Sequence, residues 1–237
     1  MPEELSEFNK SLKTAMGMRE KTPRISVNKL AEYMIADPLR RRQIVKDQKN
    51  QEPVRTSPYS DARRFIKEFI GQHYNEGMLL SAIDTMEQKE VTGKWQITNQ
   101  KNSLLALNHV IETHLPDLEE YDITYNKENN LIRLSGLDIS VYPDVLLSHK
   151  NTGKKGGLKI HLSKDNELLD PAMGYVGTLV KYHFIQMGMD EKEIDDNACI
   201  SLDVFRRAYG VSPKAYKRTI GKVEAACEEI CLRWERI

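Results

Sequence analysis

The sequence predicts an α/β protein in which a mixed sheet flanked by helices follows a helical N-terminal region. Two observations lead to this prediction. Apolar residues recur at helical spacing through most of the first half of the chain, and after about residue 120 they alternate with polar residues in short runs. We place the boundary near residue 95, with a helical region over 1–95 and an α/β domain over 96–237.

The helical region begins after a polar stretch, residues 1–24, that has the character of a tail or a weak amphipathic helix. Ser26 is a suitable N-cap for the first predicted helix, which carries Val27, Leu30, Tyr33 and Met34 at helical spacing. Asp37 and Pro38 then suit the N-cap and first position of a second helix. Residues 51–58 contain two prolines and no periodicity, so we expect a linker.

Three further helices are expected before the sheet, at 60–70, 78–86 and 102–114. The first begins at Ser60 or Asp61 and ends near the glycines Gly71 and Gly77. The third has its apolar residues on one side and is stopped by Pro116.

Strands are predicted where apolar and polar residues alternate, at 122–125, 131–134, 137–145, 158–162 and 198–205. The first two indicate a hairpin turning at Asn129 and Asn130. A helix over 173–187 separates the last two strands. Ser212 and Pro213 suit the cap of a final amphipathic helix that runs to the C-terminus.

Composition excludes several classes of protein. Charged residues make up 30% of the 237 positions, and no apolar run approaches the roughly 20 residues of a membrane span. The N-terminal residues show no secretory signal, and three cysteines make a disulfide framework an unsuitable interpretation. We therefore expect a cytoplasmic protein that is not embedded in a membrane.

The most informative pair of residues is Asp144 and Lys159. Asp144 follows Pro143 in one predicted strand, and Lys159 lies in the next, where the period of two places it with His161 on the face opposite the apolar residues. Hydrolysis of a phosphodiester calls for a divalent metal held by carboxylates and for a cation that orients water. A carboxylate and a lysine on adjacent strands suit that chemistry.

From about residue 100 to 237 the order of elements and this pair resemble the PD-(D/E)XK restriction-endonuclease-like superfamily. In that resemblance Asp144 matches the first carboxylate and Lys159 the lysine, so both are implied to be catalytic. Glu112, on the helix before the sheet, matches an additional metal-binding glutamate of some members. The resemblance therefore implies Mg²⁺ or Mn²⁺ held by Asp144 and Glu112.

The chain departs from this motif at Gly157, where the family has a second acid. His161 is a possible compensating ligand, although imidazole binds magnesium poorly. The missing acid favours binding of a nucleic acid over its cleavage.

Two basic segments are candidate contacts for a phosphate backbone. One is the second predicted helix, with Arg40, Arg41, Arg42, Lys46 and Lys49. The other is the turn before the 158–162 strand, with Lys154 and Lys155. That turn lacks the spacing of a phosphate-binding loop and precedes a strand rather than a helix. An ordinary solvated surface is the alternative interpretation of both segments.

The sequence thus predicts a nucleic-acid-binding protein with an endonuclease-like domain of weakened or lost catalysis. The resemblance suggests a subunit of a bacterial defence or DNA-processing assembly, with DNA favoured over RNA and with other protein subunits as partners. An active Mg²⁺- or Mn²⁺-dependent nuclease remains the first alternative. A protein–protein scaffold without a nucleic-acid role is the second.

Overall fold

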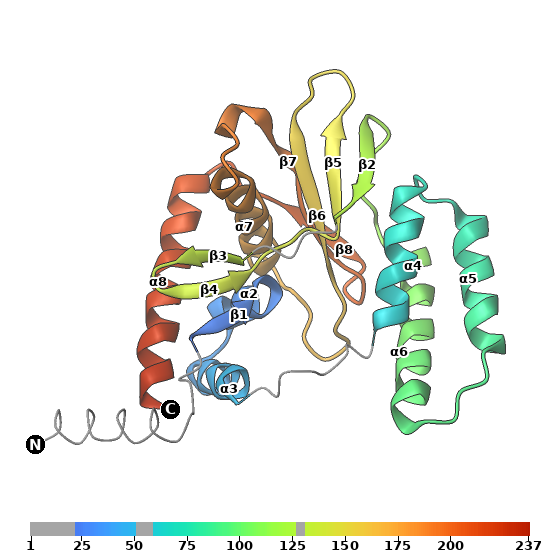
Figure 1. Ribbon diagram of the computed structural model, residues 1–237, viewed down its shortest axis with the longest axis horizontal. Helices are drawn as coiled ribbons and strands as arrows, with labels where there is room; N and C mark the ends of the chain where they lie inside the picture. The colour runs from blue at the N-terminus through green and yellow to red at the C-terminus, as the bar shows by residue number, and fades with distance from the viewer. Residues whose placement is uncertain (1–21, 51–58, 127–130) are drawn as a thin grey trace, which may run out of the picture.

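A computed structural model describes residues 22–50, 59–126 and 131–237 of the chain. A five-stranded sheet forms the centre of the molecule, with helices on both faces (Figure 1). Its strands lie in the order β2 (Tyr121–Tyr125), β5 (Val145–His149), β6 (Lys155–His161), β7 (Ile194–Asp203) and β8 (Ala208–Val211). Only the β6–β7 pair is parallel within this sheet. The predicted α/β class and mixed sheet are confirmed.

Three helices lie on one side of this sheet: α4 (Ser60–Gly71), α6 (Lys94–Ile111) and, packed against these two on the outside, α5 (Glu76–Gln88) (Figure 1). Their apolar faces form one hydrophobic core with the sheet. Ile66 of α4 and Leu107 of α6 are fully buried in it together with Leu158 and Ile160 of β6.

The opposite face is covered by α7 (Ala172–Gln186), with α8 (Tyr216–Arg236) beyond it (Figure 1). A second, three-stranded sheet lies there, in the order β1 (Arg24–Ser26), β4 (Leu137–Ser140) and β3 (Leu131–Leu134). The helices α2 (Val27–Ile35) and α3 (Pro38–Lys49) complete this layer, and a short 3-10 helix, η1 (Glu191–Glu193), leads into β7.

Each of the two main cores combines residues from before and after position 95. Leu30 of α2 is buried with Val176 of α7 and Val223 of α8, whereas Ile66 of α4 is buried with Leu158 of β6. The boundary expected near residue 95 therefore does not separate two hydrophobic cores. None of the described helices is long and apolar enough to cross a lipid bilayer.

The predicted hairpin of 122–125 with 131–134 is wrong. β2 pairs with β5 in the large sheet, whereas β3 pairs with β4 in the small one. The two strands diverge because their apolar residues enter different cores, Ile123 beside the α4–α6 layer and Ile132 beside α8. The tight turn of the small sheet is at Ser135 and Gly136, where φ is 46° and 83°.

Several boundaries also differ from expectation. α6 begins eight residues early, at Lys94, because the Gln96 side chain accepts a hydrogen bond from the Gly93 N–H at 2.8 Å and caps the helix. α8 begins at Tyr216 rather than after Ser212, and strands β1 and β8 were not expected. The expectations for residues 1–21 and for the 51–58 linker lie outside the described residues.

The basic helix α3 uses three of its five basic side chains to hold the fold together. Arg40 binds Glu32 of α2 through its Nε at 2.9 Å, and Lys49 donates to the Trp234 carbonyl of α8 at 2.6 Å. Arg41 donates to two carbonyls at the end of α2, each at 3.1 Å. These side chains therefore anchor α3 to its neighbours instead of facing a ligand.

Arg42 and Lys46 are the exposed members of the predicted nucleic-acid-binding set on α3. Neither has an ion-pair or hydrogen-bond partner for its side chain within the described residues. They are the part of the α3 prediction that remains open to an external contact.

We expect Arg41→Ala to lower the free energy of unfolding by about 1.5–3 kcal/mol, because its charged donors satisfy carbonyls at the end of α2. Arg42→Ala is the matched neighbour and should change it by less than about 0.5 kcal/mol. Urea unfolding of both variants measures the difference. Equal effects would contradict the anchoring role.

Candidate functional site

The predicted pair lies where β5 begins and the chain leaves β6. The Asp144 N–H donates to the Leu158 carbonyl at 2.8 Å, and its carboxylate accepts the Ile160 N–H at 2.8 Å. The Lys159 Nζ lies 3.3 Å from the same carboxylate and donates to the Tyr142 carbonyl at 2.9 Å. The structure therefore brings Asp144, in the bend just before β5, together with Lys159 of β6, and we call this cluster of Asp144, Lys159 and the Ile160 amide the fork.

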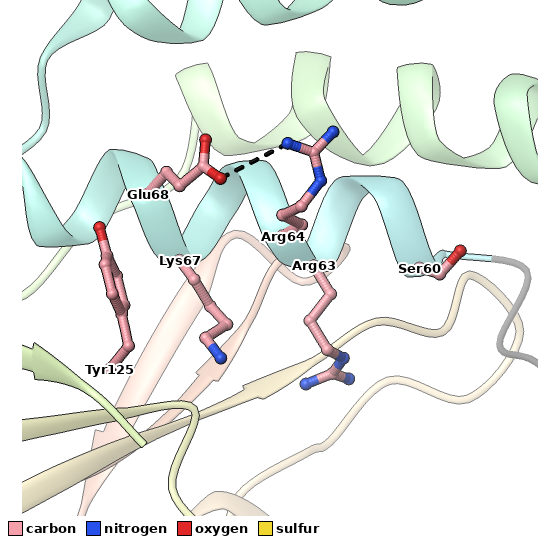
Figure 2. Close-up of a pocket in the computed structure, with 6 residues that line it drawn as sticks. All are labelled: Ser60, Arg63, Arg64, Lys67, Glu68 and Tyr125. Atoms are coloured by element: carbon pink, nitrogen blue, oxygen red, sulfur yellow. Dashed lines mark hydrogen bonds and ion pairs between the residues drawn. The ribbon is translucent and has the colours of Figure 1, made fainter. Parts of the chain in front are cut away.

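A second cation, Arg63 of α4, also reaches the fork. Its Nη1 lies 2.8 Å and 2.9 Å from the two carboxylate oxygens of Asp144 and 3.2 Å from the Ile160 carbonyl. Figure 2 shows Arg63 and Lys67 extending from α4 towards the strands. Sequence reasoning did not select Arg63, because its partner Asp144 is 81 positions away and no local pattern relates them.

The pKa of Asp144 and the pKa of Lys159 each depend on the charge of the other residue. Burial would raise the pKa of Asp144, but the charges of Arg63 and Lys159 and the Ile160 N–H hold that pKa below its ordinary value. Burial lowers the pKa of Lys159 to about 8, against the attraction of Asp144. At neutral pH one carboxylate therefore faces two cations, and the fork together with Arg63 carries excess positive charge.

The space beside Gly157, the position where the endonuclease motif has an acid, is occupied by neighbouring atoms. A Cβ added at Gly157 would lie 2.7 Å from two carbons of the Pro143 ring and 3.3 Å from the Val145 carbonyl oxygen. Any side chain there would have to displace Pro143, which directly precedes Asp144. The close contact between Gly157 and Pro143 therefore leaves no space for a carboxylate at this position.

Glu112 does not join the fork. It caps the end of α6 and pairs with Arg207 of the β7–β8 turn at 2.6 Å, with both side chains about half exposed. The predicted metal site of Asp144 and Glu112 is therefore not assembled. No group of three or more His, Cys, Asp or Glu side chains suited to a metal occurs in the described part of the chain.

The residues at the fork do not fit a hard divalent cation. Mg²⁺ and Mn²⁺ prefer several oxygen ligands that can face the ion. Both oxygens of Asp144 are already bonded to Arg63, and one also accepts the Ile160 N–H. A metal would have to displace the guanidinium group to reach them.

His161, the possible compensating ligand, has other partners. Its Nε2 lies 2.6 Å from the Asn166 carbonyl oxygen, and its strand neighbour on β7 is Asp203. Burial lowers the pKa of His161, against the attraction of Asp203. The imidazole thus ties β6 to the loop before α7.

Lys154 and Lys155 lie at the far end of the β5–β6 pair. The two strands pair from Val145–Leu158 beside the fork to Ser148–Lys155 at the opposite end. Both lysines line a separate pocket of about 380 Å³ together with Lys192. Lys154 and Lys155 therefore lie away from the Asp144 site, because antiparallel pairing places this turn at the other end of the two strands.

A pocket of about 360 Å³ lies between α4 and the end of β2. Its lining residues are Ser60, Arg63, Arg64, Lys67, Glu68 and Tyr125 (Figure 2). Arg63 links this α4 pocket to the fork, since its side chain belongs to both. The pair Arg63 and Lys67, four positions apart on one helix face, was the signal available in the sequence.

No protein-family model, curated protein or solved structure matches the chain. The likeness to endonucleases therefore stays a prediction from the order of elements and from Asp144 and Lys159.

We expect Gly157→Ala to lower the free energy of unfolding by about 1–3 kcal/mol, because the added methyl group overpacks against Pro143. Gly221→Ala in α8 is the matched control, since nothing lies within 4 Å of the added carbon. It should be neutral or stabilising by up to about 1 kcal/mol. Denaturant unfolding separates the two, and similar values for both would contradict the close packing.

The low pKa of Lys159 predicts a pH dependence of stability. The folded value of about 8 lies below the unfolded value of about 10.4, so the unfolded chain binds more protons between these pH values. The stability contributed by Lys159 therefore increases with pH across this window and is lost as the pH falls through 8. Lys159→Met should lack this increase.

The unfolding free energy of wild type minus that of Lys159→Met, measured from pH 7 to about 10, should therefore increase as the pH rises. A constant difference across that range would show that the pKa of Lys159 is not lowered in the folded state.

Proposed function

We propose that this chain is a degenerate endonuclease-like protein that binds the phosphate backbone of a nucleic acid at the α4 pocket and does not cleave it. The proposal depends on the position of Arg63, which contacts Asp144 and also lines the pocket. Arg63 occupies both oxygens of Asp144 that a metal would need, and it brings positive charge to the wall of the pocket.

The pocket offers donors for phosphate oxygens. The bonds of Arg63 within the described structure use Nη1 alone, so Nε and Nη2 remain to donate, and 31% of the side chain is exposed. Lys67 has no ion-pair partner among the described residues. A guanidinium that is fixed by a buried carboxylate is oriented in advance, which reduces the entropy lost when it binds phosphate.

The net charge supports binding of an anion. The pocket lining has three cations, Arg63, Arg64 and Lys67, and one acid, Glu68, which pairs with Arg64 at 3.4 Å. Lys159 lies behind Arg63 and adds a further positive charge. Electrostatic attraction of this kind is independent of base sequence and weakens as salt rises.

Hydrolysis lacks support in the same geometry. A nuclease of this chemistry needs a metal that polarises the phosphoryl oxygen and generates hydroxide. The carboxylate that would hold it is neutralised by two cations, and the position of the second carboxylate is filled by Pro143. With a pKa of about 8, Lys159 is mostly protonated at neutral pH, the form that pairs with Asp144.

We expect the double variant Arg64→Ala/Lys67→Ala to bind nucleic acid more weakly. The slope of log affinity against log salt should fall by about 1 for each phosphate that the variant no longer neutralises. The control is Arg42→Ala/Lys46→Ala, which removes the same charge from the exposed side of α3. Fluorescence anisotropy at several salt concentrations measures both. Weaker binding by the control variant alone would contradict binding at the α4 pocket and would indicate an interface on α3.

The same samples, incubated with Mg²⁺ or Mn²⁺, test the second half of the proposal. Intact probe is expected. Cleavage that Asp144→Asn and Lys159→Ala both abolish would show an active nuclease and overturn the proposal.

A further inference from the structure

Tyr125 gives the α4 pocket an aromatic wall. It is the last residue of β2 and pairs with Val145, directly beside the fork. Figure 2 shows its ring rising from β2 towards α4, on the side of the helix to which Arg63 and Lys67 extend. Although it is a large aromatic residue, 45% of it remains exposed.

The ring lies close to Gly71 of α4. A Cβ added at Gly71 would overlap the Tyr125 hydroxyl oxygen and would lie 2.8 Å from the ring carbon that carries it. Only glycine at this position of α4 leaves room for the ring. The Lys67 Nζ lies over the Tyr125 ring, 6.0 Å from its centroid, at the outer limit of a cation–π contact.

An exposed ring beside cations suits a particular form of nucleic acid. Single strands are bound by cationic grooves that follow the backbone and by aromatic side chains on which unpaired bases stack. In a duplex the faces of each base are covered by neighbouring bases, and extruding one costs a few kcal/mol. The pocket volume of about 360 Å³ is at the small end of ligand sites, which suits one nucleotide and not a double helix.

We infer that the α4 pocket takes an unpaired base of a single-stranded nucleic acid, stacked on Tyr125, with its phosphates bound by Lys67 and Arg63. This inference rests on the proposed function, because it specifies which nucleic acid the same pocket binds. It assigns base stacking to Tyr125 and phosphate binding to the two cations.

The test compares three fluorescent probes of equal length: a thymine single strand, a duplex, and a strand of the same backbone without bases. We expect wild type to prefer the single strand. Tyr125→Ala should weaken binding of that strand by about 5- to 150-fold, the effect of removing one aromatic platform, and leave binding of the baseless strand unchanged. Tyr125→Phe, which keeps the ring, should retain the affinity.

Two further variants control for folding and for exposed aromatic surface in general. Gly71→Ala keeps the tyrosine but displaces its ring, and should weaken binding of the single strand as Tyr125→Ala does. Trp95→Ala removes an aromatic residue of similar exposure, 46%, from α6 outside the pocket and should have no effect. Thermal unfolding of each variant confirms that it is folded.

The outcomes separate this inference from the proposed function. Equal affinity for single strand and duplex, with Tyr125→Ala unchanged and Arg64→Ala/Lys67→Ala weakened, would overturn the inference and leave the proposed function standing. Absence of binding to all three probes at low salt would overturn both.

Discussion

The buried carboxylate of Asp144 is the constraint on which the rest of the site depends. With 2% of the residue exposed, its charge must be compensated inside the protein, since an uncompensated buried ion costs several kcal/mol. Arg63, Lys159 and the Ile160 N–H provide that compensation. Because Arg63 comes from α4, the position of this helix over the end of the sheet is set by an ion pair as well as by apolar packing.

The consequences of that ion pair reach the surface. Once α4 is fixed by Arg63, Lys67 lies one helical turn further along the same face, and Gly71 one turn beyond it. This row of three positions, each four residues apart, presents a fixed cation, a second cation and a gap that accepts the Tyr125 ring. The contact between α4 and the sheet therefore determines both the ion pairs of the fork and the side chains that line the pocket.

Two glycines determine which side chains fit at the two ends of this contact. At the fork, Gly157 packs against Pro143 and excludes the second carboxylate that a metal would require, whereas Gly71 admits an aromatic ring that any larger residue would displace.

The sequence was sufficient for features that depend on neighbours along the chain. The sequence correctly placed Asp144 beside Lys159, and the side chains of Ser26 and Asp37 cap α2 and α3 as expected. The predicted strand 137–145 is wrong, because it is divided between β4 of the small sheet and β5 of the large one, with Asp144 in the bend before β5. It was insufficient where distant segments compete for a side chain. Arg40 and Arg41 looked like ligands for phosphate because their partners Glu32 and Glu229 could not be placed from local patterns. Glu112 ends the helix that the resemblance indicated, but Arg207 from the β7–β8 turn pairs with it there. The wrong hairpin has the same origin, since β2 and β3 each follow the core that their own apolar face can join.

Arg63, and not a metal, is the partner of Asp144, and a titration with Mn²⁺ tests this most directly. Calorimetry of wild type and Asp144→Asn should show no saturable binding of Mn²⁺ that the variant removes, because the carboxylate oxygens are already bonded to the guanidinium group. Saturable binding in wild type that is absent in Asp144→Asn would contradict this pairing and would restore the metal-dependent interpretation of the fork.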